Sequence, residues 1–464
     1  MITMEKIKSA DYLIEHSKHE YLTESDSQKG YFAGTLMRYQ RLEGKEVDEK
    51  TFKRMLNYGK DGFSGVEITP APPKDFSILL ERADPQLRAK LEALDDLAIN
   101  NTIRAIEQNT YYRKTENGKT TYHLAKAAAF ARFSHYTSRP TIDENGNTKI
   151  DMQKHTHIIG FPKVLGQDGK FHSHTLLESK YEKHNDHETL RYFDQVYQST
   201  IAKGLQEMGY SIERGKKDSF KIKGISDELV KEFSTRTKQT EDKVGKDASY
   251  QDKKKASLRM RNKKVVSDLA DLRPLWQKRM DDLGFTNDKI ESIKDKQQNK
   301  DLSFNEIFKD KAIISKKEMR IKALSESKFS TKTSTQILDE FKQVKMQEIS
   351  KNHYTNPKNK LGKALTPKAK PQKLNLGKGG QQKQVSNSHS GKASDNIQVS
   401  LNNLKSQYQS KMVEVAMASH SKPGREAKEL LRITSEYSQA ESELNSQLAQ
   451  ALAQESKRSQ DMDI

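Results

Sequence analysis

Two histidines separated by one residue place the strongest constraint on this chain. His155 and His157 lie in the run Asp151-Met-Gln-Lys-His-Thr-His157, and two isoleucines typical of a strand follow. Because side chains alternate across a strand, both imidazoles would lie on one face of a sheet. His135 precedes them in the chain, and a neighbouring strand would bring it to the same face. We therefore predict a three-histidine metal site that keeps open positions for a substrate.

The positive charge of the chain is confined to its later part. Residues 1–130 hold 20 basic and 20 acidic side chains, and the rest hold 62 basic and 44 acidic ones, so the whole net charge of +18 lies after residue 130. This distribution predicts a polyanionic partner, most often nucleic acid, although a solvated lysine-rich surface has the same composition. Between Lys253 and Lys264 seven residues are basic and none is acidic. Such a stretch can cross a phosphate backbone or form an exposed helix face.

Some residue types and patterns are missing from the sequence, which excludes several classes of protein. The 464 residues include no cysteine, which excludes disulfides, thiolate zinc sites and cysteine nucleophiles. No run approaches 18 apolar residues, and the N-terminus lacks an apolar signal region. We expect a soluble protein without membrane insertion, and the lack of cysteine fits a reducing cytoplasm.

Hydrophobic periodicity indicates a folded first part. Residues 1–290 have the pattern of an α/β fold. Helical spacing is found over 87–109 and over 188–208, and residues 111–124 fit a hairpin that turns at Asn117-Gly118. The fold class we predict is α+β, with a central antiparallel sheet that carries the histidines and helices that flank it.

The rest of the chain is more polar. Residues 291–355 form a polar, weakly helical segment. Residues 356–395 contain nine lysines and no acid between Pro357 and Ala393, which predicts a basic disordered linker. Residues 396–464 have the apolar spacing of a helical hairpin, with a weak coiled-coil repeat. Because only 33% of all residues are hydrophobic, a part of the chain without a core is expected.

Three other features accompany the histidines. Tyr12 and Tyr21 stand near the N-terminus, and a phenol is a competent nucleophile toward phosphorus. Glu67 and Lys74 bracket a short strand and a proline-rich turn, and Arg139 is a natural phosphate ligand. Together these residues suit metal-assisted phosphoryl transfer, in which a carboxylate orients a histidine or accepts the phenolic proton.

The order of these motifs resembles the relaxase domain of MobF-type conjugative relaxases, the TrwC/TraI kind within the HUH endonuclease superfamily. In that family the stretches read like Asp-Leu-Thr-Phe-Ser-Ala-Pro-Lys, His-x-Thr-Ser-Arg and Asp-Pro-Gln-Leu-His-Thr-His. The runs Leu205-Gln-Glu-Met-Gly-Tyr210 and Phe233-Ser-Thr-Arg-Thr237 continue the likeness. A His-x-His pair alone is more often structural, but the ordered set is specific. The resemblance covers roughly residues 5–290.

The resemblance implies site- and strand-specific nicking of plasmid DNA at a transfer origin, a 5′-phosphotyrosine link and later rejoining of the strand. Tyr12 matches the first nucleophile and Tyr21 the second tyrosine, and Glu67 matches the active-site aspartate. The three histidines match the ligands of one divalent metal ion, whether Mg, Mn or another. We expect phosphate contacts from the following basic residues: Lys74, Arg139, Lys253, Lys254, Arg259 and Arg261.

The resemblance also implies partners and a location. Single-stranded or supercoiled plasmid DNA is the substrate, and a monomer acts on it. A type IV secretion coupling protein and accessory DNA-binding proteins assist. The protein works in the bacterial cytoplasm and travels covalently with the DNA into the recipient cell.

Several residues depart from the family pattern. Glu67 is one methylene longer than the usual aspartate, and each tyrosine is single rather than paired. The run Asp143-Glu-Asn-Gly-Asn147 adds a hairpin tip between the histidine motifs. The chain lacks the phosphate-binding loop of the helicase that usually follows. A further pair, His172 and His174, matches no family ligand and is expected on a strand or turn surface.

Three alternatives remain open at this point. A rolling-circle replication initiator has the same histidine pair, but its tyrosine usually follows the histidines. A metal-dependent phosphodiesterase would use water and leave no protein on the DNA. A non-enzymatic DNA-binding protein would hold structural histidines.

Overall fold

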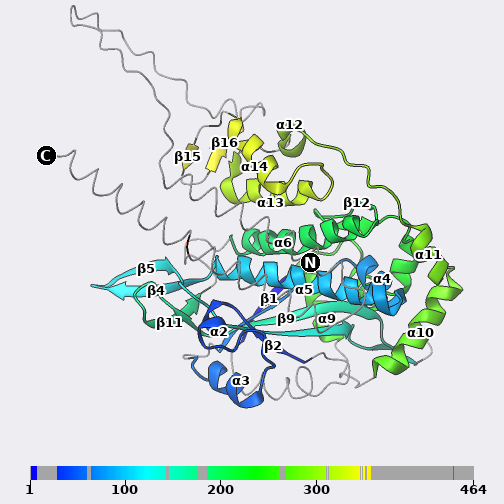
Figure 1. Cartoon of the computed structure of the whole chain (residues 1–464), viewed down its shortest axis with the longest axis horizontal. Helices are drawn as coiled ribbons and strands as arrows, with labels where there is room; N and C mark the ends of the chain where they lie inside the picture. The colour runs from blue at the N-terminus through cyan, green and yellow to red at the C-terminus, as the bar shows by residue number, and fades with distance from the viewer. Residues whose placement is uncertain are drawn as a thin grey trace, which may run out of the picture. The chain divides into compact units, whose positions relative to one another are not determined.

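A five-stranded antiparallel sheet forms the centre of the protein (Figure 1). The computed structural model describes residues 2–7, 29–59, 64–142, 146–175, 185–260, 268–309, 311, 313–344, 346, 348–350, 353–356 and 443. The strand order is β1-β3-β9-β6-β2. The bounds are β1 Thr3–Ile7, β2 Tyr31–Ala33, β3 Gly65–Thr69, β6 Phe130–Thr137 and β9 Met152–Gly160. The predicted central antiparallel sheet is confirmed.

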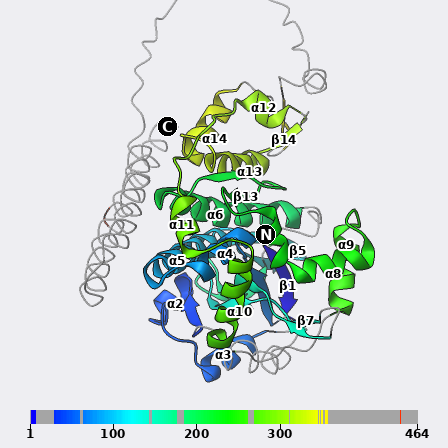
Figure 2. The same cartoon turned by 90° about the vertical axis from the view of Figure 1, so that its right-hand side faces the viewer.

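Helices cover both faces of this sheet. One face packs on α4, α5 and α6, and the other on α2 and α3 (Figures 1 and 2). The alternation along β6 shows the division, because Phe130 and Tyr136 join the larger core while Ala131 and Phe133 join the smaller one. The bounds of the helices in this part are α2 Thr35–Tyr39, α3 Glu49–Leu56, α4 Lys74–Arg82, α5 Pro85–Glu107, α6 Asn185–Glu207, α7 Asp227–Glu232, α8 Thr235–Val244, α9 Tyr250–Arg259, α10 Leu269–Asp282 and α11 Asn287–Ser292.

Local chemistry explains where the predicted elements begin and turn. Helix α5 starts after Asp84, whose carboxylate accepts the Leu87 N–H at 2.8 Å, and Pro85 fills the first helical position. The hairpin of β4 Tyr111–Glu116 and β5 Lys119–Leu124 turns at Asn117 and Gly118, which both have positive φ. The predicted helices over 87–109 and 188–208 and the predicted hairpin are thus confirmed.

The hairpin belongs to a second sheet, of order β10-β11-β4-β5, that includes β10 Lys163–Leu165 and β11 Phe171–Thr175. Two small ribbons complete this part: β12 Ile212–Arg214 with β13 Phe220–Ile222, and β7 Thr141–Ile142 with β8 Thr148–Lys149. The second ribbon flanks the predicted hairpin tip, of which residues 143–145 lie outside the described residues.

Residues 304–356 form a folded module where the sequence led us to expect a weakly helical segment. Its elements are α12 Phe304–Phe308, β14 Ile313–Ser315, α13 Lys316–Ser327, α14 Ser334–Gln343, β15 Glu348–Ser350 and β16 His353–Thr355. The strands form a sheet of order β14-β16-β15 around an apolar cluster that includes Phe308, Ile337 and Phe341. Helix α13 lies between α14 and α6 (Figure 2). The strands were not anticipated, because each is only three residues long.

All these elements belong to one compact unit, residues 1–368. The predicted basic linker after residue 356 and the predicted helical hairpin at 396–464 lie outside the described residues, apart from residue 443. Within the described part of the chain, no helix combines the length and the apolar character that a membrane crossing requires.

Candidate metal centre

Strand pairing brings the three predicted histidines together. His135 on β6 is the register partner of His155 on β9, and His157 lies two residues further along the same face. The ring centroids are 4.9–5.3 Å apart, and one ligand atom from each ring lies within 4.8 Å of the others. His135 is buried, whereas His155 and His157 are half-buried. The cluster is therefore closed on one side and accessible on the other.

Neighbouring acceptors orient two of the rings. The Nδ1–H of His155 donates to the Gln153 carbonyl at 2.9 Å. The Nδ1–H of His157 donates to the Glu67 carboxylate in a short contact across β3 and β9. Because Nδ1 carries the proton in each case, Nε2 is the ring atom that would coordinate a metal.

The donor set fits a divalent transition-metal ion. Two nitrogens bound to one ion at about 2.1 Å each are at most about 4.2 Å apart, so modest ring rotations bring all three nitrogens onto one ion from the separation of up to 4.8 Å seen here. Three neutral imidazoles leave at least one coordination position for a substrate oxygen. Among the described residues, no other group of three histidines, aspartates or glutamates has this geometry.

Glu67 takes the place expected of an orienting carboxylate. It lies on β3 opposite Ile159, one strand away from His157, and its side chain is 19% exposed. The extra methylene relative to aspartate does not prevent contact, because the Glu67 carboxylate reaches the His157 ring directly. This contact favours the interpretation in which the carboxylate orients a histidine.

The predicted tyrosines Tyr12 and Tyr21 lie outside the described residues. The segment that contains them joins β1 to β2, which are both strands of the sheet that carries the histidines. The described chain resumes at Lys29, and a Cβ on Gly30 would lie 2.2 Å from the ring of Phe133, two residues before His135. Gly30 therefore lies close to the strand of the first histidine.

Lys74 is held by the strand that carries two of the histidines. Its ammonium donates to the Met152 carbonyl at 2.7 Å. Burial lowers the pKa of Lys74 to about 8, and Asp151 opposes that shift while Arg279 reinforces it. In the structure the ammonium binds the backbone carbonyl of Met152, at the start of β9. Its predicted phosphate contact stays a prediction.

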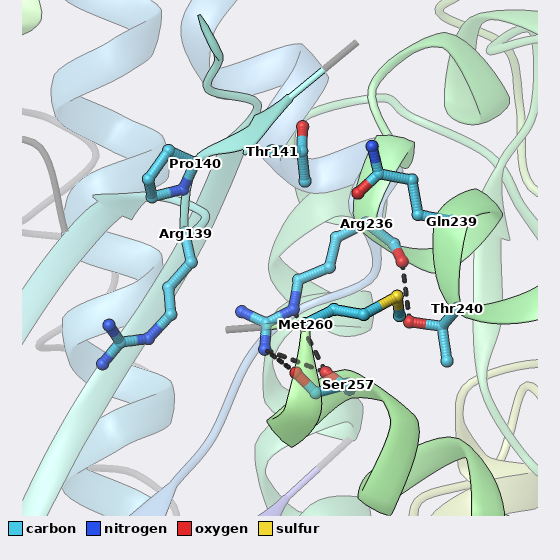
Figure 3. Close-up of a pocket in the computed structure, with 8 residues that line it drawn as sticks. All are labelled: Arg139, Pro140, Thr141, Arg236, Gln239, Thr240, Ser257 and Met260. Carbon is cyan, nitrogen blue, oxygen red and sulfur yellow. Dashed lines mark hydrogen bonds between the residues drawn. The ribbon is translucent and has the colours of Figure 1, made fainter. Parts of the chain in front are cut away.

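Arg139 borders a small pocket between the end of β6 and the helices α8 and α9. The lining residues are Arg139, Pro140, Thr141, Arg236, Gln239, Thr240, Ser257 and Met260. Figure 3 shows Arg139 on one side and Arg236 on the other. Arg236 donates to the Ser257 hydroxyl at 2.9 Å and so joins α8 to α9. Guanidinium groups from two separate elements therefore line this pocket.

The predicted basic stretch begins on α9. Lys253 pairs with Glu241 at 3.2 Å, Lys254 pairs with Glu5 at 3.4 Å, and Arg259 is exposed at the last residue of the helix. Arg261 lies outside the described residues. The contact between Lys254 and Glu5 places α9 beside β1, at an edge of the central sheet.

The expectation for the second histidine pair was wrong for His174. Its side chain is buried against Gly160, and its Nδ1–H donates to the Phe161 carbonyl at 3.0 Å. Burial lowers the pKa of His174 to about 4, so this ring is neutral at physiological pH. His172 lies nearer the surface, where it pairs with Asp168 at 2.9 Å and stacks on Tyr112. Alternation along β11 does not reveal the burial, because it comes from contacts with Gly160 and Phe161, at the end of a strand of another sheet.

Asp151 is a structural hub that the sequence did not assign. It is 2% exposed, accepts the Thr235 N–H at 2.8 Å and pairs with Arg279 at 3.0 Å. These contacts tie the start of β9 to α8 and α10. In the sequence, Asp151 is visible only as an acidic residue just before a strand. That position does not indicate which residues it contacts.

Comparison with known proteins agrees with this geometry. The TrwC relaxase family matches residues 6–283, more than half of the chain. The multifunctional conjugation protein TraI of Escherichia coli is 25% identical over 249 residues, and TraI of strain K12 is 24% identical over the same length. Each match covers 53% of this chain but only 13% of the relative.

Solved structures share the fold. The conjugative relaxase TrwC in complex with oriT DNA, in its metal-free structure, is 24% identical with a TM-score of 0.51 and covers 61% of this chain and 99% of that chain. TrwC complexed with a 27-mer DNA comprising the recognition hairpin and the cleavage site has the same identity and TM-score and covers 62% and 100%. A metal-bound TrwC structure with oriT DNA is 23% identical, with a TM-score of 0.50 and the same coverage. The chain belongs to the TrwC relaxase family of DNA-nicking enzymes.

Proposed function

We propose that this protein is a conjugative DNA relaxase that nicks one strand at a plasmid transfer origin, forms a 5′-phosphotyrosine link and later rejoins the strand. The observation that carries the proposal is the convergence of His135, His155 and His157 on one face of the sheet, with Glu67 behind His157. Solved TrwC structures that share this fold include complexes with oriT DNA and with a 27-mer DNA that comprises a recognition hairpin and a cleavage site, which supports the same class of substrate. Residues 1–290 form the nicking domain in this proposal.

The chemistry is a transesterification at phosphorus. The Tyr12 oxygen attacks the scissile phosphate, a bond forms between that oxygen and phosphorus, and the bond to the 3′ oxygen breaks. The phenolic proton is lost and the 3′ oxygen leaves as a hydroxyl, so the number of phosphodiester bonds is conserved and rejoining needs no external energy. Tyr21 serves the later strand transfer.

Each side chain of the centre has a defined task. When bound by the three histidines, a divalent ion supplies charge stabilisation to a non-bridging phosphate oxygen. Glu67 holds the His157 ring in the tautomer that presents Nε2. The half-buried state of His155 and His157 leaves room for a phosphate on the open side. A metal-bound TrwC structure supports the presence of one ion, whose identity depends on availability.

The basic surface around the centre suits the DNA strand. Arg139 lies four residues beyond His135, at the pocket that it shares with Arg236, and α9 adds Lys254 and Arg259 at the edge of the sheet. These cations would hold the strand through its phosphates. A coupling protein of the secretion channel and accessory DNA-binding proteins complete the proposed reaction, which begins in the bacterial cytoplasm with a monomer on the DNA.

A nicking assay tests the proposal. The full chain is incubated with supercoiled plasmid that carries the origin neighbouring its own gene, with divalent metal, and is quenched in SDS. We expect a nick with protein attached to the 5′ end. Tyr12→Phe and His155→Ala/His157→Ala should abolish both the nick and the attachment. Tyr39→Phe is the matched control, because Tyr39 is 56% exposed on α2 and should leave nicking unchanged.

The outcomes separate the proposal from its rivals. A nick without attached protein would indicate hydrolysis by a metal-dependent phosphodiesterase. Full nicking by Tyr12→Phe with attachment through a tyrosine after the histidines would indicate a rolling-circle initiator. A DNA mobility shift without cleavage, with the cognate origin and accessory proteins present, would contradict an enzymatic role.

A further inference from the structure

A buried lysine lies directly behind the metal centre. Along β9 the odd-numbered residues His155 and His157 face the centre, and the even-numbered residues face the helices α4, α5 and α6. Lys154 is one of the even-numbered residues and is only 3% exposed, between Met152 and Ile158, which are fully buried. A buried ammonium is costly unless a partner compensates it, so its surroundings must supply one.

Two helices supply the compensation. Asp95 of α5 is 1% exposed, and its Oδ2 lies 3.4 Å from the Lys154 ammonium. The hydroxyl of Tyr197, on α6, donates to the other oxygen of Asp95 in a short hydrogen bond. The ammonium also lies 4.4 Å from the ring centroid of Tyr136, a cation–π distance. The ammonium therefore faces groups from α5 and β6, and α6 holds the Asp95 carboxylate in place.

Helix α5 also contacts β6, the strand that pairs with β9. Tyr136 follows His135 on β6, and its hydroxyl donates to Glu92 at 3.0 Å. Glu92 and Asp95 are three residues apart on α5 and thus lie on one side of that helix. The residue beside His135 and the residue beside His155 are both fixed to α5, and the two histidines are register partners.

This anchoring matters because the histidine-bearing half of β9 lacks a continuous ladder on one flank. Strand β3 pairs with β9 over Ile158–Gly160, so that ladder ends just before His157. Before Ile158, isolated hydrogen bonds replace the ladder on this flank. The Lys154 N–H donates to the Ser77 hydroxyl at 3.0 Å, and the Thr156 N–H donates to the Pro70 carbonyl at 3.0 Å. Side-chain anchors therefore add, on this half of β9, to the constraint that the ladder with β6 supplies.

We infer that Lys154 is a positioning residue of this enzyme, which with Asp95 and Tyr197 fixes the backbone that presents His155 and His157 to the metal ion. The inference rests on the metal-binding part of the proposed function. It does not depend on which DNA is cut or on which tyrosine attacks. Lys154 touches neither substrate nor metal, and it acts through the strand.

The test uses the full chain and Co²⁺ as the probe. Lys154→Met leaves Asp95 as an uncompensated buried charge, which lowers the unfolding midpoint as well as metal affinity. Lys154→Met/Asp95→Asn removes both charges and keeps an acceptor for Tyr197, so the unfolding midpoint should return close to that of the wild type. Lys163→Met is the matched control, since Lys163 lies on β10, where it donates to Ser173.

The expected result is a loss of Co²⁺ affinity that persists after stability is restored. We expect the double variant to bind Co²⁺ about tenfold more weakly by calorimetry, the low end for residues that support ligands, with a changed visible absorption spectrum. Lys163→Met should match the wild type. A double variant with the affinity and spectrum of the wild type would overturn the inference and leave the proposed function standing. A wild-type chain that binds no Co²⁺ would overturn the metal site itself.

Discussion

Removal of one carboxylate should weaken the docking of the module at 304–356 on α6. Asp218 lies between β12 and β13 and accepts from Lys322 at 2.7 Å and from Arg191 at 3.0 Å. Its backbone carbonyl accepts from Lys328, which is fully buried. Asp218→Asn keeps the shape of the side chain and tolerates the positive φ of 62° at this position. The substitution therefore removes the charge and little else.

The exposure of the three side chains sets the magnitude. Breaking a fully buried ion pair costs about 3–5 kcal/mol, and an exposed pair is worth about 0–1 kcal/mol. Asp218, Lys322 and Arg191 are 21%, 21% and 31% exposed, between these limits. We expect Asp218→Asn to lower the free energy of unfolding by about 1–3 kcal/mol, measured by urea unfolding at neutral pH.

The matched control and the pH dependence make the prediction specific. Asp339→Asn removes an exposed carboxylate of α14 that pairs with Lys342 and should cost less than about 0.5 kcal/mol. Burial raises the pKa of Asp218, but its contacts with Lys322 and Arg191 outweigh that effect and hold the pKa below its usual range. The stabilisation is thus complete above about pH 4 and is lost as the pH falls through the folded-state pKa. Equal losses in both variants, or a difference that persists in acid, would refute the reasoning.

Three other changes have defined outcomes. Glu67→Ala should weaken Co²⁺ binding about 10–100-fold by calorimetry, and Glu67→Gln should lose less because it keeps an acceptor for His157; equal affinities would contradict an orienting role. A chain that ends at residue 356 should nick like the full chain. A chain that ends at residue 295 should have a lower unfolding midpoint, because it uncovers the face of α6 that packs on α13. Equal midpoints for the two chains would contradict a stabilising role of the module at 304–356. Burial lowers the pKa of His174 to about 4, below its value of about 6.5 in the unfolded chain. The neutral form therefore contributes stability that is full above about pH 6.5 and declines toward pH 4. His174→Asn should reduce this decline of the unfolding free energy with pH, measured by urea unfolding, and an unchanged pH dependence would contradict the prediction.

Features that depend on neighbours in the sequence could be predicted. The spacing of apolar residues located α5 and α6, and Asn117-Gly118 located a hairpin, because each signal reports the local backbone. The alternation of His155 and His157 placed both on one face for the same reason. The position of His135 beside them followed only from an assumed pairing of two neighbouring strands, and the register of β6 and β9 confirms that pairing.

Features that depend on distant partners could not be predicted. A periodicity argument states which way Lys154 points, but it does not show that Asp95 lies opposite, 59 positions earlier in the chain. The error at His174 has a related cause, because its burial comes from contacts with Gly160 and Phe161 across two sheets, which the pattern within one strand does not show. The short strands of the module at 304–356 carry too few residues for a period to be recognised.

The proposed metal centre must be open to its substrate, while the backbone that carries its histidines must be rigid. The two faces of β9 serve these two needs separately. In the proposed reaction a phosphate reaches His155 and His157, and both rings are half-buried. The ladder between β9 and β3 ends just before these residues, whereas the ladder between β9 and β6 continues past them. On the β3 flank the ligand-bearing backbone therefore has fewer pairing partners than the rest of β9. Contacts from Ser77 of α4 and from Asp95 of α5 add to the constraint from β6 without covering the site. Lys154 lies on the helical face of β9, where its pairing with Asp95 adds an electrostatic constraint to the apolar packing.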